Sequence, residues 1–500
     1  MNSPRDSHPV LTCAEAGEWE RRLLQGNESA EWRAMTAAGR AVASAIATDF
    51  REIGGLPADA RVVVLAGKGH NAGDALIAVR LLREMSPRLR VDVAFVLGER
   101  GLRPLVRRAW RDLVGEGGAA VTTLRSVEGA KATGRIDLLI DGIFGFSYRP
   151  PLPDVAVNWL QWANRADVRL RAAVDLPSGW DEAASFRADF TYATGIVKAP
   201  LLSARSAGRL RYLDLGFFAE TDDANAQDRV LRPEILDGLR RLRPAQSDKR
   251  SYGHVMLVGG SRIYPGAIML AAQSALHSGV GLVTAAVPET LAPAYAAAVP
   301  EVMWVGCPET EEGGLALEAH GLIRARGERA TAWMLGPGLG RERETMALVE
   351  SLVGTATVPV VLDADALQPA IVEAGAAPRV LTPHAGEFKR IAGEDAPGLR
   401  DFARSDRVTV LKGPVTQVCA GGTIWHAFGG GPVLARGGSG DVLAGLTGGL
   451  LAHTPKDAVG AAGRAVVWHG LAADHEARER GQVAVRTLDL VKALGPALRG

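Results

Sequence analysis

The stretch Gly437-Gly438-Ser439-Gly440-Asp441 follows a polar turn at 429–432 and precedes an apolar, helix-like run over 442–451. Its glycines allow the backbone to turn tightly and to aim successive N–H groups at one point. The positive end of the following helix dipole strengthens this anion site, and Asp441 places a carboxylate beside it. The combination suits phosphoryl transfer, in which backbone donors hold charge while a carboxylate accepts a proton from the attacking hydroxyl. A glycine-rich turn with Asp441 as an ordinary N-terminal helix residue is the alternative.

Other strand-like runs in the second half of the chain also end in glycine or polar clusters. The runs are 254–258, 331–335, 358–362, 379–381 and 407–411. Short apolar runs that alternate with helix-length segments predict parallel strands covered by helices. Because ligands bind at the carboxyl ends of such strands, we expect the polar clusters to converge on one crevice.

The first half of the chain shows a second α/β pattern that is not a repeat of the first. Its strand candidates are 61–66, 90–97, 136–140 and 170–174, with helix-length segments such as 75–85 between them. The most polar stretch lies between about residues 219 and 249. It predicts a first domain at 1–225, a linker at 226–248 that contains a short helix over 233–242, and a second domain at 249–500.

Composition excludes several classes of protein. The 57 basic and 56 acidic side chains among 500 residues leave a formal charge of +1, so we expect neither nucleic acid nor an anionic membrane as a partner. The cysteines, Cys13, Cys307 and Cys419, are widely separated, which argues against a disulfide framework or a zinc site and favours a reducing cytoplasm. Neither a secretory leader nor a run of about 18 apolar residues is found, so we expect a cytoplasmic protein that does not span a membrane.

The segment 67–72 (GKGHNA) fits the dinucleotide-binding fingerprint after a strand. The acidic ribose partner expected about 20 residues later is missing, because Asp92 lies inside the next predicted strand. This disfavours a hydride-transferring dehydrogenase. The P-loop pattern GxxxxGK[ST] does not occur, which argues against a P-loop NTPase.

From about residue 252 onward, the chain resembles the ADP- or ATP-dependent NAD(P)H-hydrate dehydratases, a ribokinase-like family. The resemblance rests on six motifs in order: 253–267 (GHVMLVGGSRIYPGA), 335–340 (LGPGLG), 362–367 (LDADAL), 381–388 (LTPHAGEF), 410–418 (VLKGPVTQV) and 435–445 (ARGGSGDVLAG). The first half resembles the usual fused partner of that enzyme, the NAD(P)H-hydrate epimerase, through 66–75 (AGKGHNAGDA), 141–145 (DGIFG) and 175–179 (DLPSG). The resemblance implies an α/β protein of two three-layer αβα domains, a Rossmann-like epimerase domain followed by a ribokinase-like domain.

For the first half, the resemblance implies a substrate site with potassium beside it. Asp175 would be an acid/base or substrate-contacting carboxylate, although capping of a turn or helix is an alternative for Asp141 and Asp175. The implied substrate contacts are His70, Asn71, Ala72, Gly73, Asp74, Gly145, Phe146, Ser147, Tyr148, Arg149, Pro150, Pro151 and Asp175, and the implied potassium ligands are Asn71, Asp141 and Ser178.

The first half departs from the glycine-rich loop typical of the family, Asn-Asn-Gly-Gly-Asp-Gly, at His70, Ala72 and Ala75. Ala72 cannot readily adopt the positive φ that glycine allows, so it tests whether the loop needs that freedom. His70 can become charged near pH 6 to 7, and we expect this to strengthen substrate binding as the pH falls from 8 to 6. Whether this half is fully active is left open.

For the second half, the resemblance implies that Asp441 is the catalytic base. The implied substrate contacts are Ala267, Gly338, His384 and Asp441, and the implied nucleotide contacts are Lys412, Gly413, Pro414, Val415, Thr416 and Gly440. His384 could instead be a buried structural histidine. Lys412 follows a strand-like run, where a lysine is costly unless it reaches solvent or an anion. Phosphoryl transfer also predicts Mg²⁺, which Asp363 and Asp365 could organise through water.

Together these features predict an enzyme that repairs hydrated NADH and NADPH. The first domain would interconvert the R and S hydrates. The second would phosphorylate the added hydroxyl of the S hydrate and eliminate phosphate, releasing AMP and phosphate if ADP is the donor. Family habit favours ADP, but no motif distinguishes ADP from ATP or NADH hydrate from NADPH hydrate. A homo-oligomer is expected, because such domains commonly assemble. The alternative is a ribokinase-type small-molecule kinase fused to a non-catalytic or weakly active epimerase-like domain.

Overall fold

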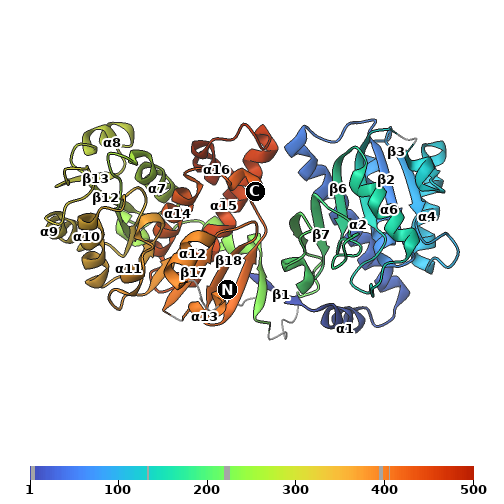
Figure 1. Cartoon of the computed structure of the whole chain (residues 1–500), viewed down its shortest axis with the longest axis horizontal. Coiled ribbons are helices and arrows are strands. Elements are labelled where there is room, and N and C mark those ends of the chain that lie inside the picture. Colours follow the sequence, from blue (N-terminus) through green and yellow to red (C-terminus); the bar gives the residue numbers. More distant parts are fainter. Residues whose placement is uncertain (2–5, 132–133, 219–225, 394–397, 405, 500) are drawn as a thin grey trace. The chain divides into compact units, whose positions relative to one another are not determined.

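The computed structural model describes residues 1, 6–131, 134–218, 226–393, 398–404 and 406–499. The chain forms two compact units (Figure 1). The N-terminal unit comprises His8–Ala226 and Arg478–Gly481, and the C-terminal unit comprises Met1–Ser7, Gln227–Ala477 and Gln482–Gly500.

The N-terminal unit is built on a parallel sheet with the strand order β4-β3-β2-β5-β6-β7-β9. Alternate residues of β2 face opposite sides of this sheet. Val62 and Val64 pack with helices α2, α3 and α4, whereas Val63 and Leu65 pack with α5 and α6, which gives three layers. The bounds are β2 Arg61–Ala66, β3 Arg90–Phe95, β4 Val121–Thr123, β5 Ile136–Gly142, β6 Val168–Val174, β7 Phe190–Thr194, β9 Arg209–Leu213, α2 Glu28–Phe50, α3 His70–Met85, α4 Pro104–Gly117, α5 Val127–Lys131 and α6 Asp154–Arg165.

Helix α1 (Cys13–Leu24) precedes this layered core. It follows β1 (Ser7–Leu11), whose residues Val10 and Leu11 pair in parallel with β8 (Val197–Lys198). Lys198 is therefore held on a short strand inside the unit.

The C-terminal unit has the strand order β13-β12-β11-β14-β15-β16-β17-β18-β19-β10. Pairing is parallel from β13 to β17, antiparallel across β17, β18 and β19, and parallel between β19 and β10. The bounds are β10 Asp228–Leu231, β11 His254–Val258, β12 Leu282–Pro288, β13 Met303–Cys307, β14 Ala332–Leu335, β15 Val360–Leu362, β16 Arg379–Leu381, β17 Arg407–Leu411, β18 Thr416–Ala420 and β19 Thr423–Ala427.

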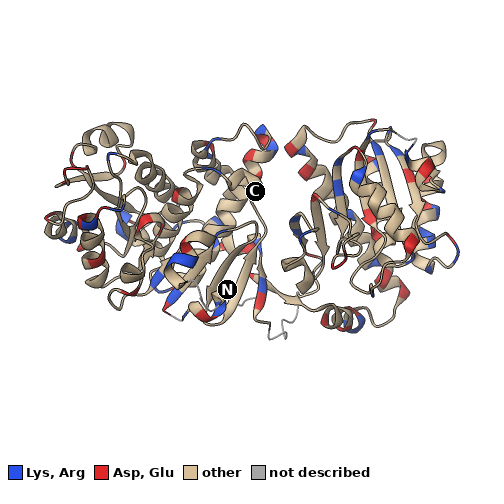
Figure 2. Cartoon of the chain, viewed as in Figure 1, with Lys and Arg blue, Asp and Glu red and all other residues tan. Residues whose placement is uncertain are grey.

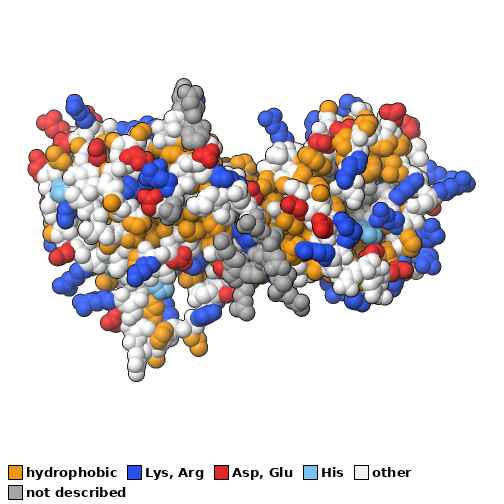
Figure 3. Space-filling view, turned by 90° about the horizontal axis from the view of Figure 1, so that it is seen from below, with side chains coloured by type: hydrophobic (Ala, Val, Ile, Leu, Met, Phe, Trp, Pro, Cys, Tyr) orange, Lys and Arg blue, Asp and Glu red, His pale blue; other side chains and the backbone are white. Residues whose placement is uncertain are grey.

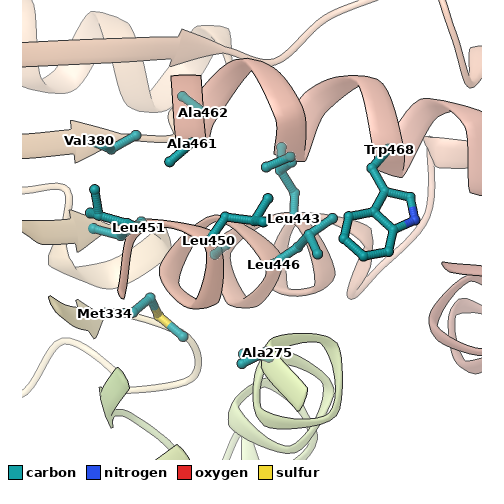
Figure 4. Close-up of a cluster of buried hydrophobic side chains, with 14 of the residues drawn as sticks. Ala275, Met334, Val380, Leu443, Leu446, Leu450, Leu451, Ala461, Ala462 and Trp468 are labelled. Carbon is teal, nitrogen blue, oxygen red and sulfur yellow. The ribbon is translucent and has the colours of Figure 1, made fainter. Parts of the chain in front are cut away.

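Helices cover both faces of the C-terminal sheet. One face packs against α7, α8, α14, α15 and α16, and the other against α9, α10, α11 and α12. Figure 4 shows part of the first cluster, in which Leu446 and Leu450 of α14 lie with Ala275 of α7 and Met334 of β14. The bounds are α7 Pro265–His277, α8 Ala292–Ala298, α9 Ala319–Gly327, α10 Arg343–Gly354, α11 Pro369–Glu373, α12 Ala385–Ala392, α13 Leu399–Phe402, α14 Ser439–His453, α15 Ala458–Arg480 and α16 Thr487–Arg499. The predicted α/β fold class is thereby confirmed.

Residues 227–248, expected as a linker, pack within the C-terminal unit. β10 pairs with β19, and the 3₁₀ helix Pro233–Arg240 buries Ile235 and Leu236 against the core. The segment is polar overall, but Val230, Leu231, Ile235 and Leu236 are buried, which composition alone did not indicate. The expected short helix at 233–242 is this 3₁₀ helix.

Charged side chains of both signs are distributed over each unit (Figures 2 and 3). Among the residues that the structure describes, no helix combines the length and apolar character needed to cross a membrane.

Candidate active sites

The N-terminal unit contains a cavity of about 390 Å³ at the carboxyl ends of β2, β5 and β6. Most residues implied as substrate contacts line it: His70, Asn71, Asp74, Gly145, Phe146, Ser147, Tyr148, Arg149, Pro151 and Asp175. Ala72, Gly73 and Pro150 are not among its lining residues. Ala72 and Gly73 are buried inside α3, where an added Cβ at Gly73 would lie 2.4 Å from the Met35 sulfur. These two positions therefore face the protein core and not the cavity.

The glycine-rich loop ends earlier than its sequence suggests. Helix α3 begins at His70 after the extended residue Gly69, so Ala72 and Ala75 are ordinary helical residues. The position that does require glycine here is Gly67, where a Cβ would lie 1.9 Å from the carbonyl oxygen of Ile143. The replacement of glycine by alanine at position 72 thus does not strain the loop.

A buried ion pair lies at the wall of the cavity. Lys198 donates a 2.5 Å hydrogen bond from Nζ to Oδ1 of Asp175, and Asp175 adopts a left-handed backbone conformation with φ of 65°. Burial alone would lower the pKa of Lys198, but the Asp175 and Glu20 carboxylates outweigh it and raise the pKa. The Glu20 carboxylate is 4.0 Å from the Lys198 ammonium.

Lys198 and Glu20 are site residues that no sequence motif indicated. Lys198 carried the same signal as Lys412, since a lysine in an apolar, strand-like segment requires an anion nearby. Glu20 carried no such signal, because it belongs to a helix with several other charged residues.

Of the three implied potassium ligands, Asn71 lines the cavity, whereas Asp141 and Ser178 are buried and are not among its lining residues. Asp141 Oδ2 accepts a hydrogen bond from the Ser178 amide at 2.7 Å, and Oδ1 accepts one from the Ser178 hydroxyl at 2.7 Å. Burial nevertheless raises the pKa of Asp141 to about 6. Asn71 donates to the Phe144 carbonyl at 2.8 Å, while its own Oδ1 is buried without a hydrogen-bond partner. An unpartnered buried oxygen of this kind fits a cation site.

His70 lies at the rim, with 44 % of its side chain exposed and Nε2 3.8 Å from Glu31. Partial burial and the nearby Arg103 charge lower its pKa, outweighing the opposite effect of Glu31. The imidazole therefore becomes charged at a lower pH than an unperturbed histidine.

The C-terminal unit brings its polar clusters together around Lys412, at the end of β17. The Lys412 ammonium donates to Asp363 Oδ1 at 2.9 Å and lies 3.8 Å from Glu387. A Cβ added to Gly440 would lie 3.2 Å from this ammonium, which places Lys412 at the N-terminus of α14. Burial tends to lower the pKa of Lys412, but Asp363 and Glu387 outweigh it and raise the pKa. The predicted convergence of Lys412 and the GGSGD stretch is thus present in the structure.

Asp441 occupies the first turn of α14, after Gly438, whose φ of 88° requires glycine. Burial, together with the negative charge of Asp363, raises the pKa of Asp441 to about 7, although Lys412 acts in the opposite direction. A carboxylate with a pKa near the working pH suits a general base.

Ala267 and Gly338 lie side by side. A Cβ on Gly338 would lie 3.1 Å from the Ala267 Cβ and 2.4 Å from the Tyr264 carbonyl oxygen, so Gly338 permits a close approach of two loops. His384 caps α12 through Nδ1, which accepts hydrogen bonds from the amides of Gly386 and Glu387. Its side chain is 60 % exposed, so it is not a buried structural histidine.

The implied nucleotide residues 412–416 form the connection between the antiparallel strands β17 and β18. Asp365 accepts hydrogen bonds from the Gly340 amide and from Arg341, each at 3.1 Å. Among the described residues, no group of three or more His, Cys, Asp or Glu side chains is arranged to hold a metal ion. Mg²⁺ bound chiefly by nucleotide phosphates and water, with Asp363 or Asp365 nearby, fits this arrangement.

Comparison with known proteins covers both units. A family model described as NAD(P)H-hydrate dehydratase matches residues 255–496, and one described as YjeF-related protein N-terminus matches residues 32–199. The bifunctional NAD(P)H-hydrate repair enzyme Nnr of Gloeobacter violaceus is 37 % identical over 523 residues, which cover 98 % of this chain and 97 % of that protein. The ADP-dependent (S)-NAD(P)H-hydrate dehydratase of Xanthomonas campestris is 37 % identical over 246 residues, 47 % of this chain and 84 % of that protein.

Among solved structures, the ADP/ATP-dependent NAD(P)H-hydrate dehydratase of Bacillus subtilis, co-crystallised with ATP and Mg²⁺, aligns with a TM-score of 0.45 and 28 % identity. The alignment covers 54 % of this chain and 96 % of that one.

Proposed function

The chain belongs to the family of bifunctional NAD(P)H-hydrate repair enzymes, and we propose that Asp441 and Lys412 serve its dehydration step while Asp175 and Lys198 serve its epimerisation step. The enzyme interconverts the R and S hydrates of NADH and NADPH and dehydrates the S hydrate with a nucleotide. The kinase alternative is not favoured, because relatives of nearly full length are repair enzymes.

In the dehydration step, the added hydroxyl of the S hydrate attacks the terminal phosphorus of the nucleotide. Asp441 takes the hydroxyl proton, and the Lys412 ammonium and the N–H groups of residues 438–440 hold the charge on the transferred phosphoryl group. The phosphoester then loses phosphate with help from the ring nitrogen, and loss of a proton from the neighbouring carbon restores the double bond. The observation that carries this assignment is the position of the Lys412 ammonium, 3.2 Å from where a Cβ on Gly440 would lie, one residue before Asp441.

ADP is the proposed donor, in line with the ADP-dependent relative that matches the C-terminal unit. The hydrate then leaves as NAD(P)H, and AMP and phosphate are released. Mg²⁺ would neutralise phosphate charge, with Asp363 and Asp365 near enough to order its water ligands.

In the epimerisation step, the hydrate occupies the 390 Å³ cavity against Asp175. The short hydrogen bond from Lys198 orients Asp175, so its carboxylate can accept a proton from water or from the substrate. Potassium would bind Asn71 Oδ1, Asp141 and Ser178, and it would supply a positive charge beside the site. Assembly into a homo-oligomer remains a prediction.

The test uses a mixture of both hydrate epimers, ADP and the full chain. Recovery of the absorbance of reduced nicotinamide from the whole mixture reports both activities. Asp441→Asn keeps the shape of the side chain but cannot accept the proton, so we expect dehydration to fall by about 100-fold or more while epimerisation continues. Near-normal dehydration by this variant would remove Asp441 from the role of base.

A further inference from the structure

Helix α1 lies at one wall of the 390 Å³ cavity of the N-terminal unit, to which it contributes Glu20. Its residues Cys13, Gly17 and Glu20 are spaced by four and three positions, which places them on one helical face. A Cβ on Gly17 would lie 3.3 Å from the Phe146 ring, and Glu20 lines the cavity directly. This face of α1 therefore looks onto the loop and the ion pair that line the cavity.

The helix is held firmly in this position. Thr12 and Glu15 form a capping box at its N-terminus, and Trp19 donates a 3.1 Å hydrogen bond from Nε1 to the Phe217 carbonyl. The matched family model begins at residue 32, so α1 lies before the stretch that it covers. Glu20 thus belongs to the site through the fold and not through a sequence motif.

The acidic residues of the cavity differ in their partners. Glu20, Asp74 and Asp175 lie near the Lys198 ammonium, but Asp175 holds the short hydrogen bond to it, and Lys68, Arg103 and Arg149 are the other basic residues that line the cavity. A carboxylate that is buried without a hydrogen-bonded cation is costly, so burial favours the protonated form of such a group. Burial raises the pKa of Glu20 to about 7, and it raises the pKa of Asp74 well above the ordinary value.

We propose that Glu20 is a further catalytic residue of the epimerisation: the acid that protonates the hydroxyl group as it leaves the hydrate. This inference rests on the proposed function of the N-terminal unit. The Glu20 side chain is 24 % exposed and lies on the cavity wall, 4.0 Å from Lys198, whereas the Lys198 side chain is only 1 % exposed. The protonated carboxyl group that borders the substrate space is thus placed to donate.

The proposed step balances in atoms and charge. Water adds to an enamine at the carbon next to nitrogen, so the hydrate carries its hydroxyl on the carbon bonded to the ring nitrogen. Glu20 gives its proton to that oxygen, the C–O bond breaks with its electron pair on the oxygen, and water departs while the nitrogen lone pair forms a C=N⁺ bond. Water then adds to the other face and gives a proton to the Asp175 carboxylate, and proton exchange with solvent returns Asp175 and Glu20 to their starting forms.

Several titratable or charged groups face Glu20 from the neighbouring elements. They are Lys198 of β8, Asp175 after β6, Asp74 and His70 of α3, Glu31 of α2, Cys13 of α1 and Arg149 of the 145–151 loop. The pKa of Lys198 is raised and that of His70 is lowered, so neither titrates near pH 7. We therefore expect the kcat of epimerisation to fall as the pH rises above about 7, because Glu20 loses the proton that it must donate.

The test compares Glu20→Gln with Glu18→Gln, an exposed glutamate on the same helix. The full chain is given the purified R hydrate, and formation of the S hydrate is followed with the uncatalysed rate subtracted. Glu20→Gln should lower kcat by about 100-fold with little change in KM and should remove the fall above pH 7. Glu18→Gln should match the wild type. The circular dichroism spectrum and thermal unfolding of each variant show whether the N-terminal unit is folded, because dehydration of the S hydrate reports only on the C-terminal unit.

Glu20→Asp is a second variant, which is needed if Glu20→Gln does not fold. It keeps a carboxyl group, so it should retain part of the epimerisation rate and the fall of kcat at alkaline pH. A Glu20→Gln variant with wild-type kcat and pH profile would overturn the inference. So would a variant that raises only KM, since Glu20 would then be part of the cavity wall alone. A wild-type chain without epimerisation would instead refute the proposed function itself.

Discussion

At the residue scale, we expect the ionised Asp441 carboxylate to lower the free energy of unfolding, although the catalytic step requires it. Its pKa is raised to about 7 in the folded chain by burial and by Asp363, so folding favours the protonated form. The contribution of Asp441 to the free energy of unfolding therefore falls as the pH rises from the ordinary aspartate range toward 7, because its ionisation is costlier in the folded state than in the unfolded state. Asp441→Asn should therefore have a higher Tm than the wild type at pH 8 and no such advantage at pH 4. Equal Tm differences at the two pH values would show that Asp441 ionises freely.

His70 provides a second test at the same scale. Because burial and Arg103 lower its pKa, the imidazole stays neutral between pH 8 and pH 7. The difference in hydrate affinity between the wild type and His70→Asn should be constant over that range and should grow only below about pH 6.5. Binding titrations of both proteins from pH 8 to pH 5.5 measure this difference. A constant difference over the whole range would assign His70 a structural role only.

At the element scale, apolar runs that end in glycine or polar residues located many of the parallel strands, but not β12 or β13. β2, β11, β16 and β17 have the predicted bounds, because a buried strand requires apolar residues and the loop after it requires glycine or polar groups. The sequence did not reveal β10 or the antiparallel pair of β18 and β19. β10 is distant from β19 in the sequence, so no local pattern indicates their pairing. β18 and β19 form a hairpin around Gly421 and Gly422, which is a local signal that the prediction missed.

The residues of the two candidate sites likewise divide into those that a local pattern predicts and those that only the folded chain brings together. Motif residues such as Asp175, Lys412 and Asp441 could be predicted because each follows a strand or begins a helix at the ligand-binding edge. Glu20 could not, since helix α1 reaches the cavity only through the folded chain. Lys198 was missed although it carried the same signal as Lys412, a lysine in an apolar, strand-like segment. The potassium set, the identity of the donor and the magnesium site remain predictions.

Packing of α14 against α7 gives a prediction at this scale. A Cβ on Gly445 would lie 2.0 Å from the Ala271 carbonyl oxygen, so the two helices can pack only with glycine at this position. Gly445→Ala should lower the free energy of unfolding by about 3 kcal/mol, as overpacking of a core does. Gly495→Ala in α16 is the matched control, because a Cβ there would meet no atom within 4 Å. This substitution should raise the free energy of unfolding by about 0.5–1 kcal/mol. Denaturant unfolding measures both variants, and equal effects would contradict the tight contact.

At the scale of the whole molecule, each unit has its own core clusters and its own site, so the two should be separable. We expect a fragment 227–500 to bind nucleotide and dehydrate the S hydrate, and a fragment 8–226 to bind no nucleotide. Nucleotide binding that requires both fragments would contradict this division.

Two C-terminal fragments that begin at different residues test whether residues 227–248 are a linker or a structural part of the C-terminal unit. A fragment that begins at Lys249 lacks β10 and the 3₁₀ helix Pro233–Arg240, and with them Val230, Leu231, Ile235 and Leu236, which are at most 6 % exposed. Burial of each such side chain contributes about 2 kcal/mol, and removal of β10 also leaves one edge of β19 unpaired. We therefore expect the fragment 249–500 to have a lower Tm than 227–500 and to aggregate more readily. Calorimetry and light scattering on the two fragments measure this, and equal Tm values would show that residues 227–248 act only as a linker.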